Sequence, residues 1–119
     1  MANINETVNA MMQLDGALGA AIVDYNSGML LGSVGGGVDL ELAAAGNSEV
    51  VKAKLKTMRS LGLHSQIEDI LITLSDQLHI IRPSQANEGL FLYLVLSKAG
   101  NLALARRKVM DVEKDLSTI

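Results

Sequence analysis

Cysteine and tryptophan are both absent from this chain of 119 residues, and phenylalanine occurs only once. Without cysteine the chain has no disulfide framework, no thiolate metal site and no cysteine nucleophile. Aromatic residues make up only 3% of the chain, so the core must be aliphatic and platforms for stacking nucleobases are nearly excluded. We expect one domain over residues 1–119, because two halves of roughly 60 residues would each be marginal without such staples.

Basic charge is not in excess either. Ten Lys and Arg residues stand against thirteen Asp and Glu residues, which gives a net charge of −3. Proteins that bind nucleic acid by its phosphates normally carry a strong basic excess. We therefore expect no nucleic-acid partner.

A long hydrophobic run is also lacking. The longest apolar run, residues 90–96, has seven residues, whereas a membrane span needs about 18. The first six residues contain neither the basic segment nor the apolar segment of a signal peptide. We expect a cytoplasmic protein without a transmembrane segment. Its mean hydropathy of +0.28 is high for a small domain and favours a second buried surface, as in an oligomer.

Hydrophobic periodicity predicts three helices and five strands. The expected helices cover residues 4–14, 40–61 and 102–116, with Asn3, Asp39 and Asn101 as N-caps and Gly62 as the C-cap glycine. The expected strands cover residues 20–25, 29–34, 68–75, 78–82 and 90–96. Residues 46–48 (Gly-Asn-Ser) are a place for the long helix to bend or break. The last strand does not alternate, so it is central, and helices on both faces make a three-layer α/β/α sandwich.

Motifs for catalysis are missing. The two histidines, His64 and His79, have no second ligand at helical spacing, and no serine stands in a G-x-S-x-G motif. We therefore expect no enzyme, no metal and no cofactor. The glycine run Gly35–Gly37 precedes a helix, where anions bind, but Asp39 brings a negative charge to the same place. It is favoured as a flexible connection, with ligand binding as the alternative.

A basic row lies on the long predicted helix. Lys52, Lys56 and Arg59 are spaced i, i+4 and i+7, on the side opposite the apolar stripe. The row is either a solvated face or a docking surface for an acidic patch on a partner.

The third predicted strand is unusually apolar for its position. If residues 90–96 are central, antiparallel neighbours leave residues 68–75 at one edge of the sheet. Residues 70–74 (ILITL) contain no Lys, Pro or bulge of the kind that protects an exposed edge. Pairing with a second chain is the natural solution.

Three stretches of the sequence resemble the roadblock (dynein light chain) family in its bacterial form. They are LDGALGAAIVDYNSGMLLG at 14–32, IEDILITL at 67–74, and LFLYLVL at 90–96 followed by NLALAR at 101–106. Together with the order of elements, the resemblance covers most of residues 4–116. It implies a profilin-like roadblock fold with a five-stranded antiparallel sheet, order 2-1-5-4-3. The long helix would then lie on one face and the two terminal helices on the other.

The resemblance also implies partners. Roadblock proteins form homodimers or heterodimers in which the third strands pair and the long helices lie side by side. Bacterial members associate with Ras-like small GTPases, and eukaryotic relatives are dynein light chains or signalling scaffolds. The family supplies no catalytic motif to carry over.

We therefore predict a regulatory module that binds a Ras-like small GTPase, as a homodimer or as a heterodimer with a paralogue. The residues predicted for the dimer interface are Val50, Leu61, Ile70, Ile72 and Leu74. The residues predicted for partner docking are Lys52, Lys56 and Arg59. The alternatives are a non-catalytic scaffold or motor-adaptor light chain, and a small-ligand sensor that uses Gly35–Gly37.

Overall fold

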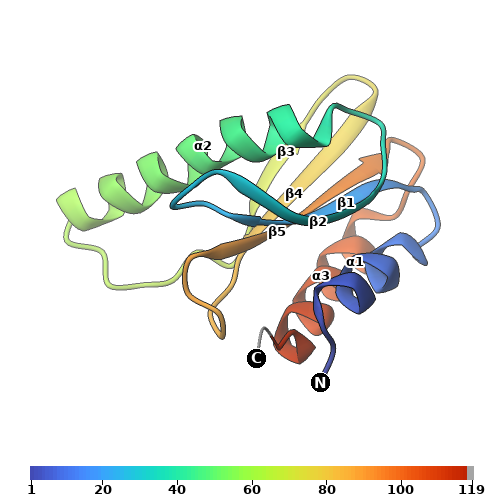
Figure 1. Ribbon diagram of the computed structural model, residues 1–119. Helices are drawn as coiled ribbons and strands as arrows, with labels where there is room; N and C mark the ends of the chain where they lie inside the picture. Colours follow the sequence, from blue (N-terminus) through green and yellow to red (C-terminus); the bar gives the residue numbers. More distant parts are fainter. Residues whose placement is uncertain (118–119) are drawn as a thin grey trace.

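An antiparallel sheet of five strands forms the middle layer of the protein (Figure 1). The computed structural model describes residues 1–117. The elements in chain order are α1 (Ile4–Met12), β1 (Ala17–Asp24), β2 (Met29–Gly35), α2 (Leu40–Ser60), β3 (Ile70–Thr73), β4 (Gln77–Pro83), β5 (Leu90–Ser97) and α3 (Leu102–Asp115). The strand order is β2-β1-β5-β4-β3, so the predicted topology is confirmed.

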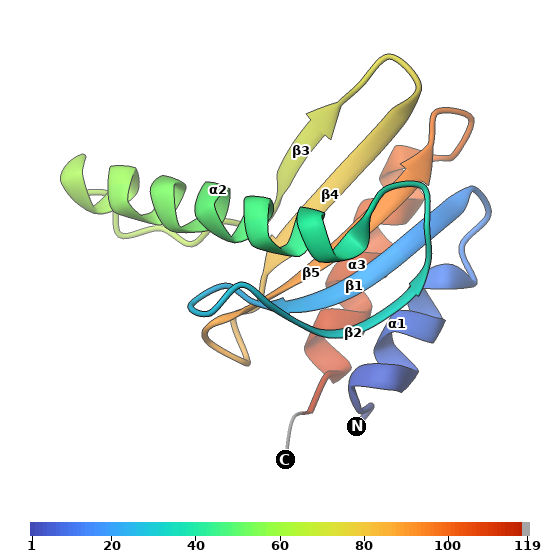
Figure 2. The ribbon, with the colours of Figure 1, turned by 45° about the horizontal axis from the view of Figure 1, so that its top comes forward.

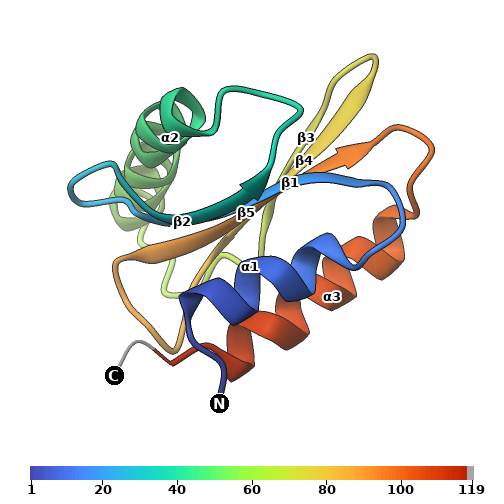
Figure 3. The same cartoon turned by 45° about the vertical axis from the view of Figure 1, so that its right-hand side comes forward.

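Helices cover both faces of the sheet. α2 lies across one face, and α1 and α3 lie side by side on the other (Figures 1 and 3). The central strand β5 is buried from Phe91 to Leu96, as its lack of alternation predicts. Its side chains alternate between the two layers: Leu92 and Leu94 pack with α1 and α3, while Phe91 and Tyr93 pack under α2.

The predicted helix caps are all present. Asn3 and Glu6 form a reciprocal capping box, and Asp39 and Asn101 accept hydrogen bonds from backbone amides of the first turns of α2 and α3. The first helix ends at Met12, before the predicted residue 14. Gln13 and Leu14 turn the chain with i→i−3 hydrogen bonds, and β1 then begins at Ala17, earlier than predicted.

α2 runs without interruption through residues 46–48, where the sequence offers a bend. The buried hydroxyl of Ser48 donates to the carbonyl oxygen of Ala44 at 2.6 Å, so this polar side chain is satisfied inside the helix. At the other end Gly62 has a φ of +70°, and the amide of Leu63 donates to the carbonyl oxygen of Met58. This is the Schellman ending that the glycine predicts.

β3 is shorter than the predicted strand 68–75, because the residues before it are bound elsewhere. Arg106 makes two hydrogen bonds to the carboxylate of Asp69, at 2.7 and 3.3 Å. Arg82 donates to the carbonyl oxygen of Glu68 at 2.8 Å. Side chains from α3 and β4 thus hold residues 68–69, and the sheet ladder begins only at Ile70.

The two ends of the chain meet below α1 and α3 (Figure 3). The amide of Ala2 donates to the carbonyl oxygen of Asp115, and the amide of Ser117 donates to that of Ala2, both at 2.7 Å. Within residues 1–117, none of the helices is both long enough and apolar enough to cross a membrane.

Candidate functional site

Helix α2 extends beyond the sheet that supports it (Figure 2). Its first half is anchored by buried residues Ala44, Ser48 and Val51. Its second half contains no fully buried residue after Val51, and Leu55 and Met58 are half-buried. The overhang therefore leaves two long flanks of the helix accessible to other molecules.

The two sets of predicted binding residues on α2 lie on opposite flanks. Successive side chains of an α-helix are rotated by about 100° about the helix axis. Lys52 therefore lies about 100° from buried Val51 in one direction, and Val50 lies about 100° from it in the other. Arg59, seven residues after Lys52, lies on the same flank as Lys52, and Leu61, eleven residues after Val50, lies on the same flank as Val50. The prediction that the basic row lies opposite the apolar stripe is wrong, because Lys52 and Arg59 flank the stripe instead. Only Lys56 is turned further toward solvent.

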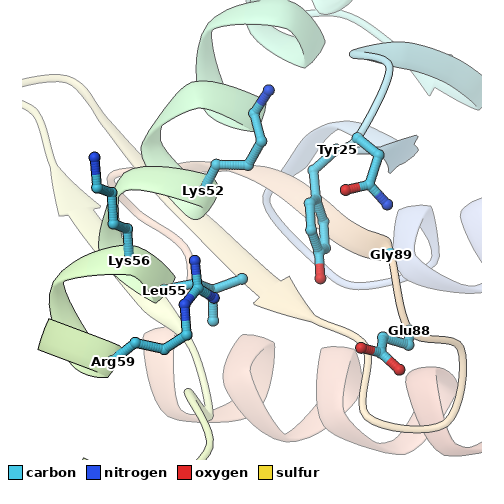
Figure 4. Close-up of a pocket in the computed structure, with 8 residues that line it drawn as sticks. Tyr25, Lys52, Leu55, Lys56, Arg59, Glu88 and Gly89 are labelled. Carbon is cyan, nitrogen blue, oxygen red and sulfur yellow. The ribbon is translucent and has the colours of Figure 1, made fainter. Parts of the chain in front are cut away.

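The basic flank of α2 borders a hollow of about 770 Å³ (Figure 4). Three segments line it: α2, the turn after β1 and the loop before β5. The lining residues are Tyr25, Asn26, Lys52, Leu55, Lys56, Arg59, Glu88 and Gly89. All three predicted docking residues are thus brought to one hollow, with Glu88 as the single acidic side chain in its lining.

The three cations that line this hollow differ in whether they form an ion pair. Lys52 pairs with Glu49 on the same helix, with 3.0 Å between Nζ and Oε1. Lys56 and Arg59 have no ion pair with any residue of the range 1–117. Positive charge is therefore available to an incoming anion.

A second hollow of about 310 Å³ adjoins the first and shares Tyr25, Leu55 and Glu88 with it. Its remaining lining residues are Ser65, Gln66, Ile67, Pro83, Ser84 and Gln85. We call the two hollows together the α2 groove. Sequence reasoning missed Tyr25 and Glu88, because both lie next to turns, and no local pattern shows which turns meet the end of a distant helix.

The residues predicted for dimerisation lie on the opposite flank of α2, at its C-cap Leu61, in β3 and at Leu74 just after β3. Val50, Leu61 and Leu74 are exposed at 43%, 66% and 40%. Ile70 and Ile72 are half-buried and pack against the core under α2, so their side chains also support the fold. Leu71, which was not predicted, is 40% exposed on the other face of the sheet. Within the described residues β3 pairs only with β4, so its outer edge is open.

The glycines of the proposed ligand loop are held by other parts of the fold. The amide of Gly36 donates to the carbonyl oxygen of Leu18 at 2.8 Å, and the side chain of Gln77 donates to the carbonyl oxygen of Gly37 at 2.9 Å. Gly35 has a φ of +78°, and a Cβ there would collide with the carbonyl oxygen of Leu18. The glycines thus serve a close approach to β1, and they do not line the α2 groove.

His79 belongs to a polar chain under α2. The Tyr93 hydroxyl lies 3.0 Å from His79 Nδ1, and His79 Nε2 lies 3.0 Å from Gln77 Oε1. Gln77 uses its amide NH₂ on Gly37, so its oxygen accepts and the histidine hydrogen is on Nε2. Burial lowers the pKa of His79, and nearby Asp76 opposes this shift. Among residues 1–117, no three His, Asp or Glu side chains gather to hold a metal ion.

The fold is shared with proteins of known structure. The sequence matches no protein-family model and none of the curated proteins. The structure is similar to MglB of Myxococcus xanthus, with a TM-score of 0.82 and 17% identity over 94% of this chain and 89% of that one. It is equally similar, at a TM-score of 0.82 and 14% identity, to a Roadblock/LC7 domain from Streptomyces avermitilis, over 96% and 94% of the two chains.

A third similar structure is the gliding protein MglB of Thermus thermophilus, with a TM-score of 0.69 and 16% identity over 92% of this chain and 87% of that one. An MglB with a tetrameric arrangement matches equally well. This protein therefore has the Roadblock/LC7 fold, and the fold expected from the sequence resemblance is confirmed.

Proposed function

We propose that this protein is a dimeric regulatory module of the roadblock type that binds a Ras-like small GTPase. The observation that carries the proposal is the separation of two accessible surfaces on one overhanging helix. One flank of α2 carries exposed Val50 and Leu61, the open edge of β3 offers a second pairing surface, and the other flank of α2 is basic and borders a groove. Such a molecule can bind a copy of itself and a different partner at the same time.

The dimer uses the open edge of β3. A sheet edge without charges, proline or a bulge pairs readily with another strand, and two-fold pairing of β3 with β3 closes the assembly. Leu74 lies beside this edge, and Val50 and Leu61 extend the apolar surface along α2. A second copy covers all three and places the two α2 helices together. A paralogue with the same edge gives a heterodimer by the same contacts.

The GTPase docks on the basic flank. Lys56 and Arg59 are exposed and unpaired among residues 1–117, so they lose no internal contact when an acidic surface approaches. Complementary charge increases the association rate and selects against basic partners. Leu55, half-buried in the lining of the same hollow, adds apolar contact area.

The test is made with a Ras-like GTPase encoded beside the gene for this protein. GTP hydrolysis and nucleotide exchange are measured with the wild-type protein, with the triple variant Lys52→Glu/Lys56→Glu/Arg59→Glu and with Lys114→Glu. Lys114 is an exposed lysine of α3 that lines neither hollow of the groove, so it is the matched control. We expect the wild type and the control to alter turnover and the triple variant to leave it unchanged.

Two results separate this proposal from its alternative. Binding without any effect on hydrolysis or exchange favours a scaffold or motor-adaptor role on the same fold. Absence of binding to the wild-type protein contradicts the GTPase partner and leaves the dimer to be tested separately.

A further inference from the structure

The α2 groove has two halves with different chemistry. The larger half is bordered by Lys52, Lys56 and Arg59 and is cationic. The smaller half has no basic residue, and the residues that it does not share with the larger half are four neutral polar ones and two apolar ones. The ring of Tyr25, with Leu55 and Glu88, lies between the halves and belongs to both. An elongated ligand with one anionic end and one neutral polar end matches this division.

The polar groups of the groove are available to a ligand. Within residues 1–117, the side chains of Ser65, Gln66 and Gln85 make no hydrogen bond, and neither does the hydroxyl of Tyr25. Ser84 is different, because its hydroxyl already donates to Glu113 at 3.2 Å and accepts from the amide of Asn87. The neutral half thus offers two glutamine amides, each able to donate and accept, near an aromatic ring.

Figure 4 shows how the labelled side chains are arranged. Arg59 reaches from α2 toward Leu55, the ring of Tyr25 descends between the helix and the loop, and the carboxylate of Glu88 stands on the far side. No ion pair joins Arg59 to Glu88, so neither charge is neutralised by the other. Glu88 repels phosphate from its own side, which directs an anionic group toward the helix.

We propose that the α2 groove binds a mononucleotide with two or three phosphates. The phosphates contact the cations of α2, and the planar base packs on Tyr25 and hydrogen-bonds with Gln66 and Gln85. Glu88 accepts a hydrogen bond from a ribose hydroxyl, as a carboxylate does in other nucleotide sites. The hollows of about 770 and 310 Å³ are of the size of small-molecule sites.

A nucleic acid is a poorer match than a free nucleotide. The chain is net negative, and only three cations border the groove, whereas a polynucleotide needs positive charge along its track.

This site is distinct from the Gly35–Gly37 loop. It goes beyond the proposed regulatory function, but it shares the basic residues with the GTPase surface. Nucleotide and GTPase would therefore compete.

The experiment measures binding to the full-length protein alone by calorimetry, in the absence of divalent cations, so its result does not depend on any GTPase. The probes are ATP, pyrophosphate and adenosine. We expect ATP to bind more tightly than pyrophosphate, and adenosine to bind most weakly. Lys56→Gln and Arg59→Gln should each weaken ATP binding about tenfold, as expected for loss of one charge-assisted hydrogen bond.

Matched variants locate each end of the ligand. Lys54→Gln makes the same charge change on the same helix outside the groove and should alter ATP affinity less than twofold. Gln66→Ala should weaken ATP but leave pyrophosphate unchanged, because only the base reaches Gln66. All four residues are exposed, so the variants should keep the wild-type melting temperature.

Three results would overturn the proposal. The first is absence of ATP binding at millimolar concentration. The second is an equal loss with Lys54→Gln and Arg59→Gln, which means attraction to the overall charge of the helix. The third is equal affinity for ATP and pyrophosphate together with no effect of Gln66→Ala, which means an anion site without a nucleotide site.

Discussion

Arg82 and Glu113 form an ion pair in the interior, with 3.0 Å between Nε and Oε1 and less than a tenth of either side chain exposed. The pair joins β4 to the end of α3. Ser84 donates to the second carboxylate oxygen, and another nitrogen of Arg82 donates to the carbonyl oxygen of Glu68. The network therefore also positions the segment that leads into the edge strand β3.

Removing one partner of this pair should strongly destabilise the protein. We expect Glu113→Ala to lower the free energy of unfolding by about 3–5 kcal/mol, because Arg82 is left charged and buried without its carboxylate. Urea denaturation at fixed protein concentration measures the change. Asp111→Ala is the control, since it removes an exposed pair with Arg107 and should change stability by less than about 1 kcal/mol. Equal effects of the two variants would contradict the structural importance of the network.

Substitution of Leu74 should weaken the proposed dimer without unfolding the protomer. Leu74 is 40% exposed beside the open edge of β3, so Leu74→Asp places a charge in the interface but not in the core. Light scattering coupled to gel filtration should show a dimer for the wild type and a monomer for the variant. Leu104→Asp, at an exposed leucine of α3 on the other layer, should remain dimeric. A monomeric wild type at tens of micromolar would refute the dimer.

The stability of the protein should fall in mildly acidic solution partly because of His79. Burial lowers the pKa of His79 in the folded state from its ordinary 6.5, so the unfolded chain binds the proton first. The contribution of His79 is complete above about pH 6.5 and is lost as the pH falls through the folded pKa.

We expect His79→Gln to flatten the decrease of unfolding free energy below pH 6.5, by at most about 1.4 kcal/mol per pH unit. Urea denaturation across pH 5 to 8 measures the slope. His64→Gln, at an exposed loop residue, should retain the wild-type slope. The same slope in all three proteins would show that the proton uptake lies elsewhere.

Replacing Gly46 or Gly62 by alanine should change the free energy of unfolding in opposite directions. Neither Gly46 nor Gly62 has an atom within 4 Å of an added Cβ, so sterics do not separate them. Gly46 lies inside α2 in ordinary helical conformation, and Gly46→Ala should stabilise the fold by up to about 1 kcal/mol. Gly62 has a φ of +70°, and Gly62→Ala should destabilise it by about 1–2 kcal/mol. Urea midpoints measure both, and a shared sign would contradict the αL helix ending.

Local signals in the sequence determined the elements and much of their arrangement. Asn3, Asp39 and Asn101 specify helix starts because their side chains bind backbone amides only a few residues away. The continuous apolar run from Phe91 to Leu96 specifies a central strand, because side chains on both of its faces then meet a helix layer. These interactions are short-range or depend on periodicity alone, so a single sequence reveals them.

Only the tertiary structure decided which distant residues meet. β3 begins at Ile70 because Arg82 and Arg106, from β4 and α3, hold the two residues before it. The basic row lines a groove because the turn at Tyr25 and the loop at Glu88 lie next to the second half of α2. Such contacts join residues tens of positions apart, and their partners are set by how layers pack, which no local pattern of charge or hydropathy contains.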